Sequence, residues 1–323
     1  MKNIICIILF SLVFFLSQSL RAEDTIKVLI IENPDDQLPD EKTEKIGHLK
    51  GETFISGAIY RGFIEVRKDE NGLYFINELP FEKYIEGVVA AETGKEWTIE
   101  ALKAQAVISR TYAIYKKNQN SGKAYHITSS VLHQVYKGDN ANKTISKAVK
   151  ETEGEILTYE GSLIEAFYHS TCRGKTELPD VVWGGSFPYL ISVPCRGKHS
   201  PYEHWQRRFH LEEIEKTLGL NGIKDISIIS FTPTGRVALL KFITDDSDIE
   251  IKATDLRKLL GYRELPSTLF SLTIEGGDVI FTGGGYGHGV GLSQWGALEL
   301  ANEGKSYKTI LAYYYPGTVL EKM

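Results

Sequence analysis

The sequence predicts an α+β fold in which mixed β-hairpins pack around one buried helix, preceded by a β-rich N-terminal lead. Three observations support this prediction. Short apolar runs separated by turn signals fill the first part of the chain, and residues 98–117 have the pattern of a helix with almost no polar face. Beyond them, strands and helices alternate without a regular βαβ rhythm, which favours α+β over a doubly wound sheet.

Residues 1–22 have the layout of a secretory signal peptide. Lys2 precedes an apolar run from Ile4 to Leu16, which is too short for a comfortable membrane span, and Ala22 stands before two acidic residues. We therefore expect export to the periplasm or cell wall, with the membrane involved only if the signal is not cleaved. The predicted division is a signal peptide (1–22), a β-rich segment (23–80) and a catalytic body (81–323).

The overall charge excludes one class of partner. The chain has 37 Lys and Arg residues against 42 Asp and Glu residues, for a net charge of −5, and the predicted signal contains two of the basic residues. A mildly acidic chain without a Lys/Arg block is a poor binder of nucleic acid.

Strand signals dominate the segment before Pro80. Ile26–Ile31 is an apolar run of strand length, and the runs Phe63–Val66 and Leu73–Ile76 flank an Asn71-Gly72 pair that is typical of a hairpin turn. Residues 33–50 are polar and contain two prolines, which predicts a loop.

Two helices follow. Apolar residues recur at helical spacing from Tyr84 to a stop near Gly94, and a longer helix begins after Thr98, a plausible N-cap. Lys103 and Arg110 are the only charged residues between positions 101 and 113 of this second helix. Because seven residues make two turns, both cations should project from the same side.

The rest of the chain alternates short elements. The expected strands and helices are Ile156–Tyr159, Leu163–Tyr168, Val237–Ile243, a helix at Leu256–Leu260, Leu272–Ile274, Val279–Phe281, and helices at Ser293–Glu303 and Lys308–Tyr314.

Two cysteines, Cys172 and Cys195, remain after the predicted signal is removed. An even pair in an exported chain predicts a disulfide. The alternative is zinc held by His169, Cys172, Cys195 and His199, although this spacing matches no tight zinc signature. No other cofactor is expected.

Seven of the 30 glycines fall between Gly283 and Gly296. The spacing does not satisfy G-x-G-x-x-G, so the segment is not predicted to cradle phosphate. It would instead present His288, Ser293 and Gln294 at the start of a helix, unless it is a tight structural turn with a satisfied histidine.

Glu92 is the other unusual position, because five small or apolar residues precede it. Burial raises the pKa of a carboxyl group and makes it useful as a general acid, whereas most glutamates are solvated surface residues.

Several ordered motifs stand out along the chain. They are FEKYIEGVVAAETGKEWTIEALKAQAVISRTY (81–112), Ser130 to Gly138, FYHSTC (167–172), Val182-Trp183, Pro188 to Leu190, GHGVGLSQWGA (287–297) and Tyr314 to Gly317. Together these motifs resemble the SpoIID/LytB family, the stage II sporulation protein D and amidase-enhancer group. The resemblance covers most of residues 55–323 and departs from the family pattern at Thr93-Gly94 and Arg173.

This resemblance implies a peptidoglycan lytic transglycosylase that cleaves glycan strands denuded of stem peptides to 1,6-anhydro-muramoyl ends. Glu92 would be the catalytic acid. The residues implied to line the substrate cleft are Lys103, Gln105, Arg110, His169, His288, Ser293, Gln294 and Tyr314.

The resemblance also implies a second possibility from a different class. The chain could be a glycan-binding accessory protein that stimulates a cell-wall amidase without a reaction of its own. A zinc hydrolase ranks last, because no HExxH motif is present.

Overall fold

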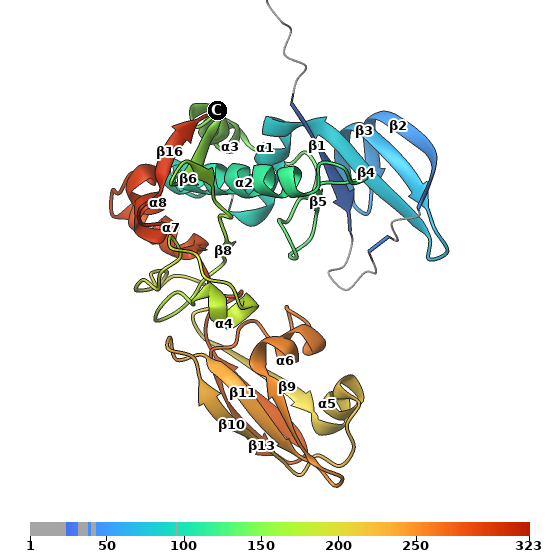
Figure 1. The fold of residues 1–323 in the computed structure, drawn as a ribbon, viewed down its shortest axis with the longest axis vertical. Coiled ribbons are helices and arrows are strands. Elements are labelled where there is room, and N and C mark those ends of the chain that lie inside the picture. Colours follow the sequence, from blue (N-terminus) through green and yellow to red (C-terminus); the bar gives the residue numbers. More distant parts are fainter. Residues whose placement is uncertain (1–23, 32–37, 40–42, 95) are drawn as a thin grey trace, which may run out of the picture.

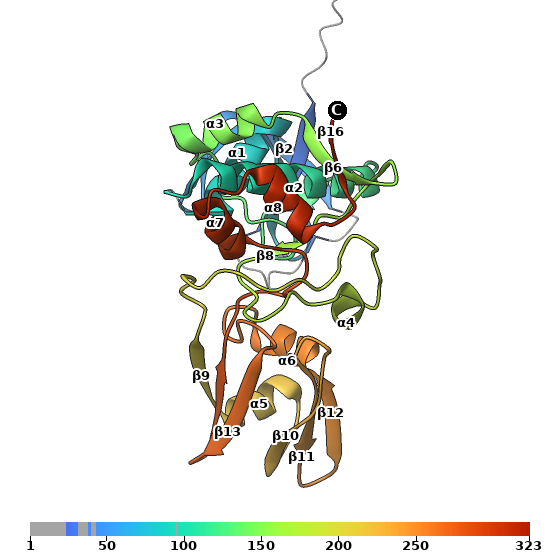
Figure 2. The same cartoon turned by 90° about the vertical axis from the view of Figure 1, so that its left-hand side faces the viewer.

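The computed structural model describes residues 24–31, 38–39, 43–94 and 96–323, and it has two lobes joined by a middle layer (Figures 1 and 2). It contains helices and several small sheets, which confirms the α+β prediction. The predicted signal peptide, residues 1–22, lies outside the described residues. None of the helices in the described part of the chain combines the length and apolar character that a bilayer crossing requires.

The β-rich N-terminal segment forms a five-stranded sheet in the order β2-β3-β4-β1-β5. All neighbours are antiparallel except β1 and β5. The predicted hairpin is confirmed, since β3 and β4 pair around residues 69–72. Its strands are β1 (Thr25–Ile30), β2 (Glu44–Ile55), β3 (Ala58–Lys68), β4 (Leu73–Pro80) and β5 (Ile127–Thr128).

The prediction of a loop over residues 33–50 is wrong for residues 44–50, because the strand β2 begins at Glu44. Most side chains of β2 are exposed, so the strand lacks the apolar alternation that marks a strand in sequence. Its backbone pairing with β3 along nearly its whole length holds it in place instead.

The buried helix is confirmed as the centre of the upper lobe. It is α2 (Ile99–Gln119), and nearly every side chain from Ala101 to Ala113 is buried. The helices α1 (Phe81–Glu92) and α3 (Lys143–Glu151) pack against it (Figure 1). The strand β6 (Glu155–Tyr159) and the helices α7 (Gln294–Asn302) and α8 (Tyr307–Tyr314) also contact it.

The remaining elements of the upper lobe come from both ends of the body. Instead of one hairpin reaching Tyr168, β6 pairs with the short β7, and β8 then pairs in parallel with β15. This parallel pair brings residues 168–169 beside residues 292–293. The elements are β6 (Glu155–Tyr159), β7 (Ser162–Leu163), β8 (Tyr168–His169), β15 (Leu292–Ser293), α7 (Gln294–Asn302), α8 (Tyr307–Tyr314) and β16 (Val319–Lys322).

The lower lobe is inserted between β8 and β15. It has two three-stranded sheets and a hydrophobic core of its own, and it lies within the range 81–323 that the sequence predicts as one catalytic body. The helix α4 (Pro179–Trp183) lies between the lobes (Figure 1). The inserted elements are β9 (Trp205–His210), α5 (Leu211–Leu218), β10 (Asp225–Phe231), β11 (Val237–Ile243), β12 (Asp248–Lys252), α6 (Ala253–Leu260), β13 (Phe270–Glu275) and β14 (Asp278–Gly283).

Candidate functional site

Glu92 is the last residue of α1, and the apolar side chains before it anchor this helix in the core. Val88 and Val89 are fully buried. Thr93 ends the helix, because its hydroxyl donates a hydrogen bond of 2.7 Å to the carbonyl oxygen of Val89. The carboxylate is therefore held at the end of a rigid element.

Three neutral groups donate hydrogen bonds to the Glu92 carboxylate. Oε1 accepts from the backbone N–H of Val135 at 2.7 Å and from the hydroxyl of Tyr168 at 3.1 Å. Oε2 accepts from the side-chain amide of Gln294 at 3.0 Å. Four segments that are far apart in the chain thus converge on one carboxylate.

Burial raises the pKa of Glu92 above the ordinary glutamate value, and the three hydrogen bonds only partly oppose that shift. The direction is the one that the apolar residues before Glu92 predict. Within the part of the chain that the structure describes, none of the groups bonded to it is charged and no ion pair to it is found. Such a carboxyl group can retain a proton to a higher pH than a solvated glutamate and then donate it.

Gln105 is linked to Glu92 through Gln294. Its side-chain carbonyl is 3.4 Å from the Gln294 amide nitrogen, and its own amide donates to Ser109. Gln105 is almost completely buried. It therefore orients Gln294 and does not touch Glu92 directly.

Arg110 and Lys103 face away from Gln105, since Lys103 precedes Gln105 by two residues, or about 200° around the helix. Arg110 is fully buried and makes a two-pronged ion pair with Glu82, with both bonds 2.8 Å long. Lys103 pairs with Glu151 of α3 at 2.7 Å. Both cations do project toward the α3 side, but acidic partners already occupy them, and their role in substrate binding stays a prediction.

His169 and His288 form a second group beside the first. Nδ1 of His169 bonds the carbonyl of Val290 at 3.0 Å, and Nδ1 of His288 accepts from the N–H of the same residue at 3.1 Å. The two ring centroids are 5.8 Å apart. Burial lowers the pKa of His169 and brings that of His288 to about 3, so both rings are neutral at neutral pH.

Ser293 and Tyr314 have structural contacts. The Ser293 hydroxyl accepts a hydrogen bond from Gly296 and caps α7. Tyr314 is almost fully buried against Gly296. The structure therefore brings Gln294 to Glu92 directly, whereas a substrate contact of either Ser293 or Tyr314 stays a prediction.

The glycine-rich segment needs its glycines because other chain segments approach it closely. A Cβ at Gly291, which has a positive φ of 73°, would overlap the carbonyl oxygen of Phe167. At Gly289 a Cβ would lie 2.8 Å from the guanidinium of Arg236, which belongs to the inserted lobe. The segment is thus a packed junction between the lobes.

Arg236 and Glu177 form the centre of that junction, and both are almost fully buried. Arg236 donates to the carbonyl of Cys172 at 2.8 Å and lies 3.9 Å from the Glu177 carboxylate. Thr232 and Thr234 donate to the same carboxylate at 2.7 and 2.6 Å. A polar cluster therefore joins the inserted lobe to the upper one.

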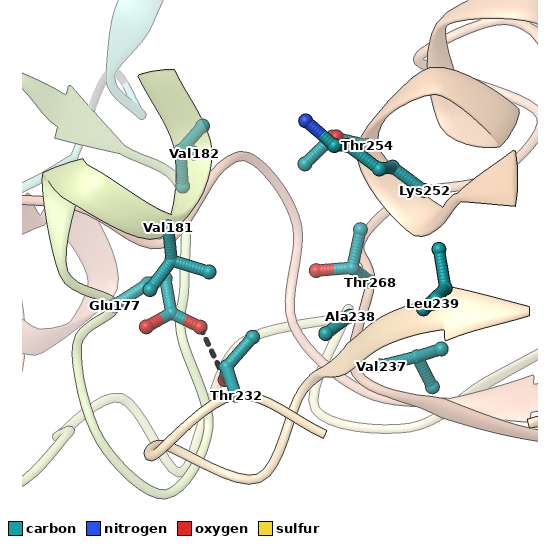
Figure 3. Close-up of a pocket in the computed structure, with 10 residues that line it drawn as sticks. All are labelled: Glu177, Val181, Val182, Thr232, Val237, Ala238, Leu239, Lys252, Thr254 and Thr268. Carbon is teal, nitrogen blue, oxygen red and sulfur yellow. Dashed lines mark hydrogen bonds between the residues drawn. The ribbon is translucent and has the colours of Figure 1, made fainter. Parts of the chain in front are cut away.

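A cavity of about 220 Å³ opens beside this cluster, between α4 and the inserted lobe (Figure 3). Val181 and Val182 line one side, and Leu239 and Lys252 lie on the other. Glu92 is not among its lining residues. The cavity is therefore separate from the carboxylate centre.

Cys172 and Cys195 are joined by a disulfide, with Cα atoms 5.9 Å apart. A group of three or more His, Cys, Asp or Glu side chains able to hold a metal is not found among the described residues. His199 does not join His169 in such a group.

Sequence reasoning assigned no role to two residues that bond Glu92. Tyr168 lies directly before His169 in the FYHSTC motif, so a tyrosine within that motif was the available signal. Val135 contributes a backbone N–H, which no residue pattern reveals.

Comparisons with known proteins give two matched regions. The family model described as stage II sporulation protein (SpoIID) matches residues 69–159, and a model described as a domain of unknown function matches residues 198–291, which span the inserted lobe.

Several relatives cover most of this chain, among them two sporulation proteins and an amidase enhancer. A stage II sporulation protein D of Bacillus amyloliquefaciens is 36% identical over 75% of this chain and 74% of its own length. Its Bacillus subtilis counterpart is 34% identical over 76% of each chain. An amidase enhancer of B. subtilis is 31% identical over 73% of this chain but only 40% of its own length.

Proposed function

Because this chain belongs to the stage II sporulation protein D family, we propose that it is a lytic transglycosylase acting on the glycan strands of peptidoglycan. The observation that carries the proposal is the environment of Glu92, a single carboxyl group with a raised pKa and three neutral donors. Denuded strands are the proposed substrate.

A single acid suffices for this reaction. Hydrolytic glycosidases generally use two carboxyl groups, and the second one activates water or attacks the sugar. A lytic transglycosylase uses the 6-hydroxyl of the muramoyl sugar as the nucleophile, so no second carboxylate is needed to position water. The groups that bond Glu92 in the structure are three neutral donors, and none of the three is a second carboxylate.

In the proposed reaction, protonated Glu92 donates its proton to the bridging oxygen as the bond from that oxygen to C1 breaks. The leaving strand departs as an alcohol. The Glu92 carboxylate then takes the proton of the 6-hydroxyl while the oxygen of that hydroxyl bonds C1. This step closes a 1,6-anhydro ring and restores the protonated acid. The donors from Val135, Tyr168 and Gln294 stabilise the carboxylate between the two steps.

The substrate lies outside the cytoplasm, so we propose that the mature protein is exported to the periplasm or the wall. The predicted signal peptide supports this location. We propose no cofactor, because acid–base chemistry at Glu92 requires none.

The relative named amidase enhancer supports a second candidate, in which the chain binds glycan and stimulates a cell-wall amidase. The two candidates differ in what the pure protein does alone. A transglycosylase releases anhydro ends without any partner, whereas an accessory protein changes only the rate of an added amidase.

The deciding experiment incubates purified protein with denuded glycan strands and analyses anhydro and reducing ends by mass spectrometry. Wild-type protein should release anhydro ends, and Glu92→Gln should lower the rate by roughly 10²–10⁴-fold, the usual contribution of a general acid. Glu86→Gln is the matched control, because Glu86 lies on the same helix but bonds Ser146 and Lys83. Unchanged release by Glu92→Gln would contradict the assignment.

A further inference from the structure

Trp97 and Trp295 form an aromatic pair beside the carboxylate centre. Trp97 lies in the turn after α1, where its backbone N–H donates a hydrogen bond to the carbonyl of Gly94. Trp295 directly follows Gln294, the residue whose amide bonds Glu92. The two ring centroids are 5.5 Å apart in an edge-to-face arrangement, and both side chains are partly exposed.

Gly94 makes room for this pair. A Cβ at Gly94 would lie 2.5 Å from Nε1 of Trp97, so a larger residue would displace the indole. The departure of Thr93-Gly94 from the family pattern thus has a physical account. The Thr93 hydroxyl bonds the carbonyl of Val89 at the end of the helix, and Gly94 leaves room for the Trp97 ring close to the backbone two residues after Glu92.

A second aromatic group is centred on Trp183, the last residue of α4. Its side chain is 49% exposed, which is high for a tryptophan. One face stacks on Phe167, with centroids 4.4 Å apart and planes within 25°, and His288 lies 4.9 Å away. Phe167 directly precedes Tyr168, whose hydroxyl bonds Glu92.

The two groups share one relationship to the centre. Each contains a ring that is next in sequence to a residue bonded to Glu92: Trp295 follows Gln294, and Phe167 precedes Tyr168. The fourth tryptophan, Trp205, is different, because it is buried and its indole N–H donates to the carbonyl of Gly285. Three of the four tryptophans are therefore partly open, and all three belong to the two groups near Glu92.

The chemistry of these groups favours an uncharged ring as the ligand. A tryptophan face is apolar and its edge carries one N–H donor, which matches the apolar face and hydroxyl edge of a pyranose. The rings that surround Trp183 are a phenylalanine and a histidine that is neutral at neutral pH. The rings of both groups are themselves uncharged.

We propose that the Trp97–Trp295 pair and the Trp183–Phe167 stack are two sugar-binding subsites that hold consecutive parts of a glycan strand at Glu92. This inference rests on the proposed function, since it assigns the substrate contacts of the same site. It also explains why tryptophans are left partly open beside a carboxylate that, among the described residues, accepts hydrogen bonds from three neutral donors.

The test measures binding of N-acetylglucosamine oligosaccharides by calorimetry in Glu92→Gln protein, so that no cleavage intervenes. Trp97→Ala and Trp183→Ala should each weaken binding about tenfold, which corresponds to the loss of one aromatic stacking contact. Phe54→Ala is the matched control, because Phe54 is 74% exposed on β2 of the N-terminal sheet. Its affinity should not change.

A second measurement covers variants that fail to fold. In Glu92→Gln protein with all tryptophans present, saturating oligosaccharide should reduce quenching of tryptophan fluorescence by acrylamide, because the sugar covers the open rings. Unchanged quenching, or full affinity in both alanine variants, would overturn the subsites.

The outcomes separate this inference from the proposed function. If wild-type protein releases no anhydro ends but binding still depends on Trp97 and Trp183, the subsites stand and the transglycosylase proposal fails. If cleavage occurs and the two variants bind like the parent, the transglycosylase proposal stands and the subsites fail.

Discussion

The side-chain amide of Gln294 donates a hydrogen bond of 3.0 Å to Oε2 of Glu92, joining two residues that are 202 positions apart. The same amide nitrogen is 3.4 Å from the carbonyl oxygen of Gln105, which helps to fix its orientation. The last helices of the chain thus complete a site that begins at the end of α1.

Replacing Gln294 with leucine should shift the pH dependence of cleavage. The Gln294 hydrogen bond stabilises the ionised carboxylate and lowers the pKa of Glu92, so its loss raises that pKa further. The falling limb of the pH–rate profile, where the acid loses its proton, should move to higher pH. Gln206→Leu, at an exposed position on β9, should leave the profile in place. An unmoved limb in Gln294→Leu would refute this coupling.

Replacing Arg110 with methionine should destabilise the fold by about 1–3 kcal/mol, because the partly exposed Glu82 and the carbonyls of Glu155 and Val149 lose a buried donor. Urea unfolding measures the change. The partly exposed Arg207, which bonds the backbone carbonyl of Gln206, provides the control, and Arg207→Met should cost far less. If Arg110→Met instead keeps full stability and loses glycan affinity, the predicted substrate-binding role of Arg110 is correct and the structural one is not.

Replacing Arg236 with methionine should loosen the junction between the lobes. The variant loses the bond to the Cys172 carbonyl and the positive charge near Glu177. Hydrogen exchange measured by mass spectrometry should become faster in residues 284–291. Arg208→Met removes a side chain that is 59% exposed and should not change that exchange. Equal protection in both variants would show that Arg236 does not hold the loop.

His288 should remain neutral well below neutral pH. Burial lowers its pKa from 6.5 to about 3, so between these pH values the residue is protonated in the unfolded chain but neutral in the folded one. The stability that this residue contributes is present above about pH 6.5 and is lost as the pH falls toward 3. NMR should show its ring resonance, identified with His288→Gln, unchanged from pH 7.5 to 5, whereas protein in urea should titrate. A midpoint near 6.5 in the folded protein would contradict this prediction.

Replacing both Cys172 and Cys195 with serine should lower stability by about 3 kcal/mol, because the bridge closes a loop across 23 positions. Thermal unfolding with and without reductant measures the loss. Thiol titration and zinc analysis of the mature protein serve as the check. Two free thiols with one bound zinc would favour the metal alternative over the disulfide.

Local patterns were sufficient where the residues of one segment set its conformation by themselves. The helix around Ala101–Ala113 was predictable because it has no polar face, and the 69–72 hairpin was predictable from its Asn-Gly pair. The strand β2 was missed because backbone pairing, and not an apolar face, holds its polar sequence.

The candidate site divides in the same way. The spacing of Lys103 and Arg110 predicted that both share one side of α2, but it could not reveal Glu151 and Glu82, which belong to other helices and occupy them. The sequence by itself determined the fold class and the buried helix, because these follow from periodicity and from the residue types of single segments, and the resemblance of its motifs to a known family implied Glu92 as the candidate acid. Only the tertiary structure decided which side of α2 faces Glu92, which neutral donors hold it and where the tryptophans stand. Those relationships are contacts between segments up to 202 residues apart, and no local pattern contains them.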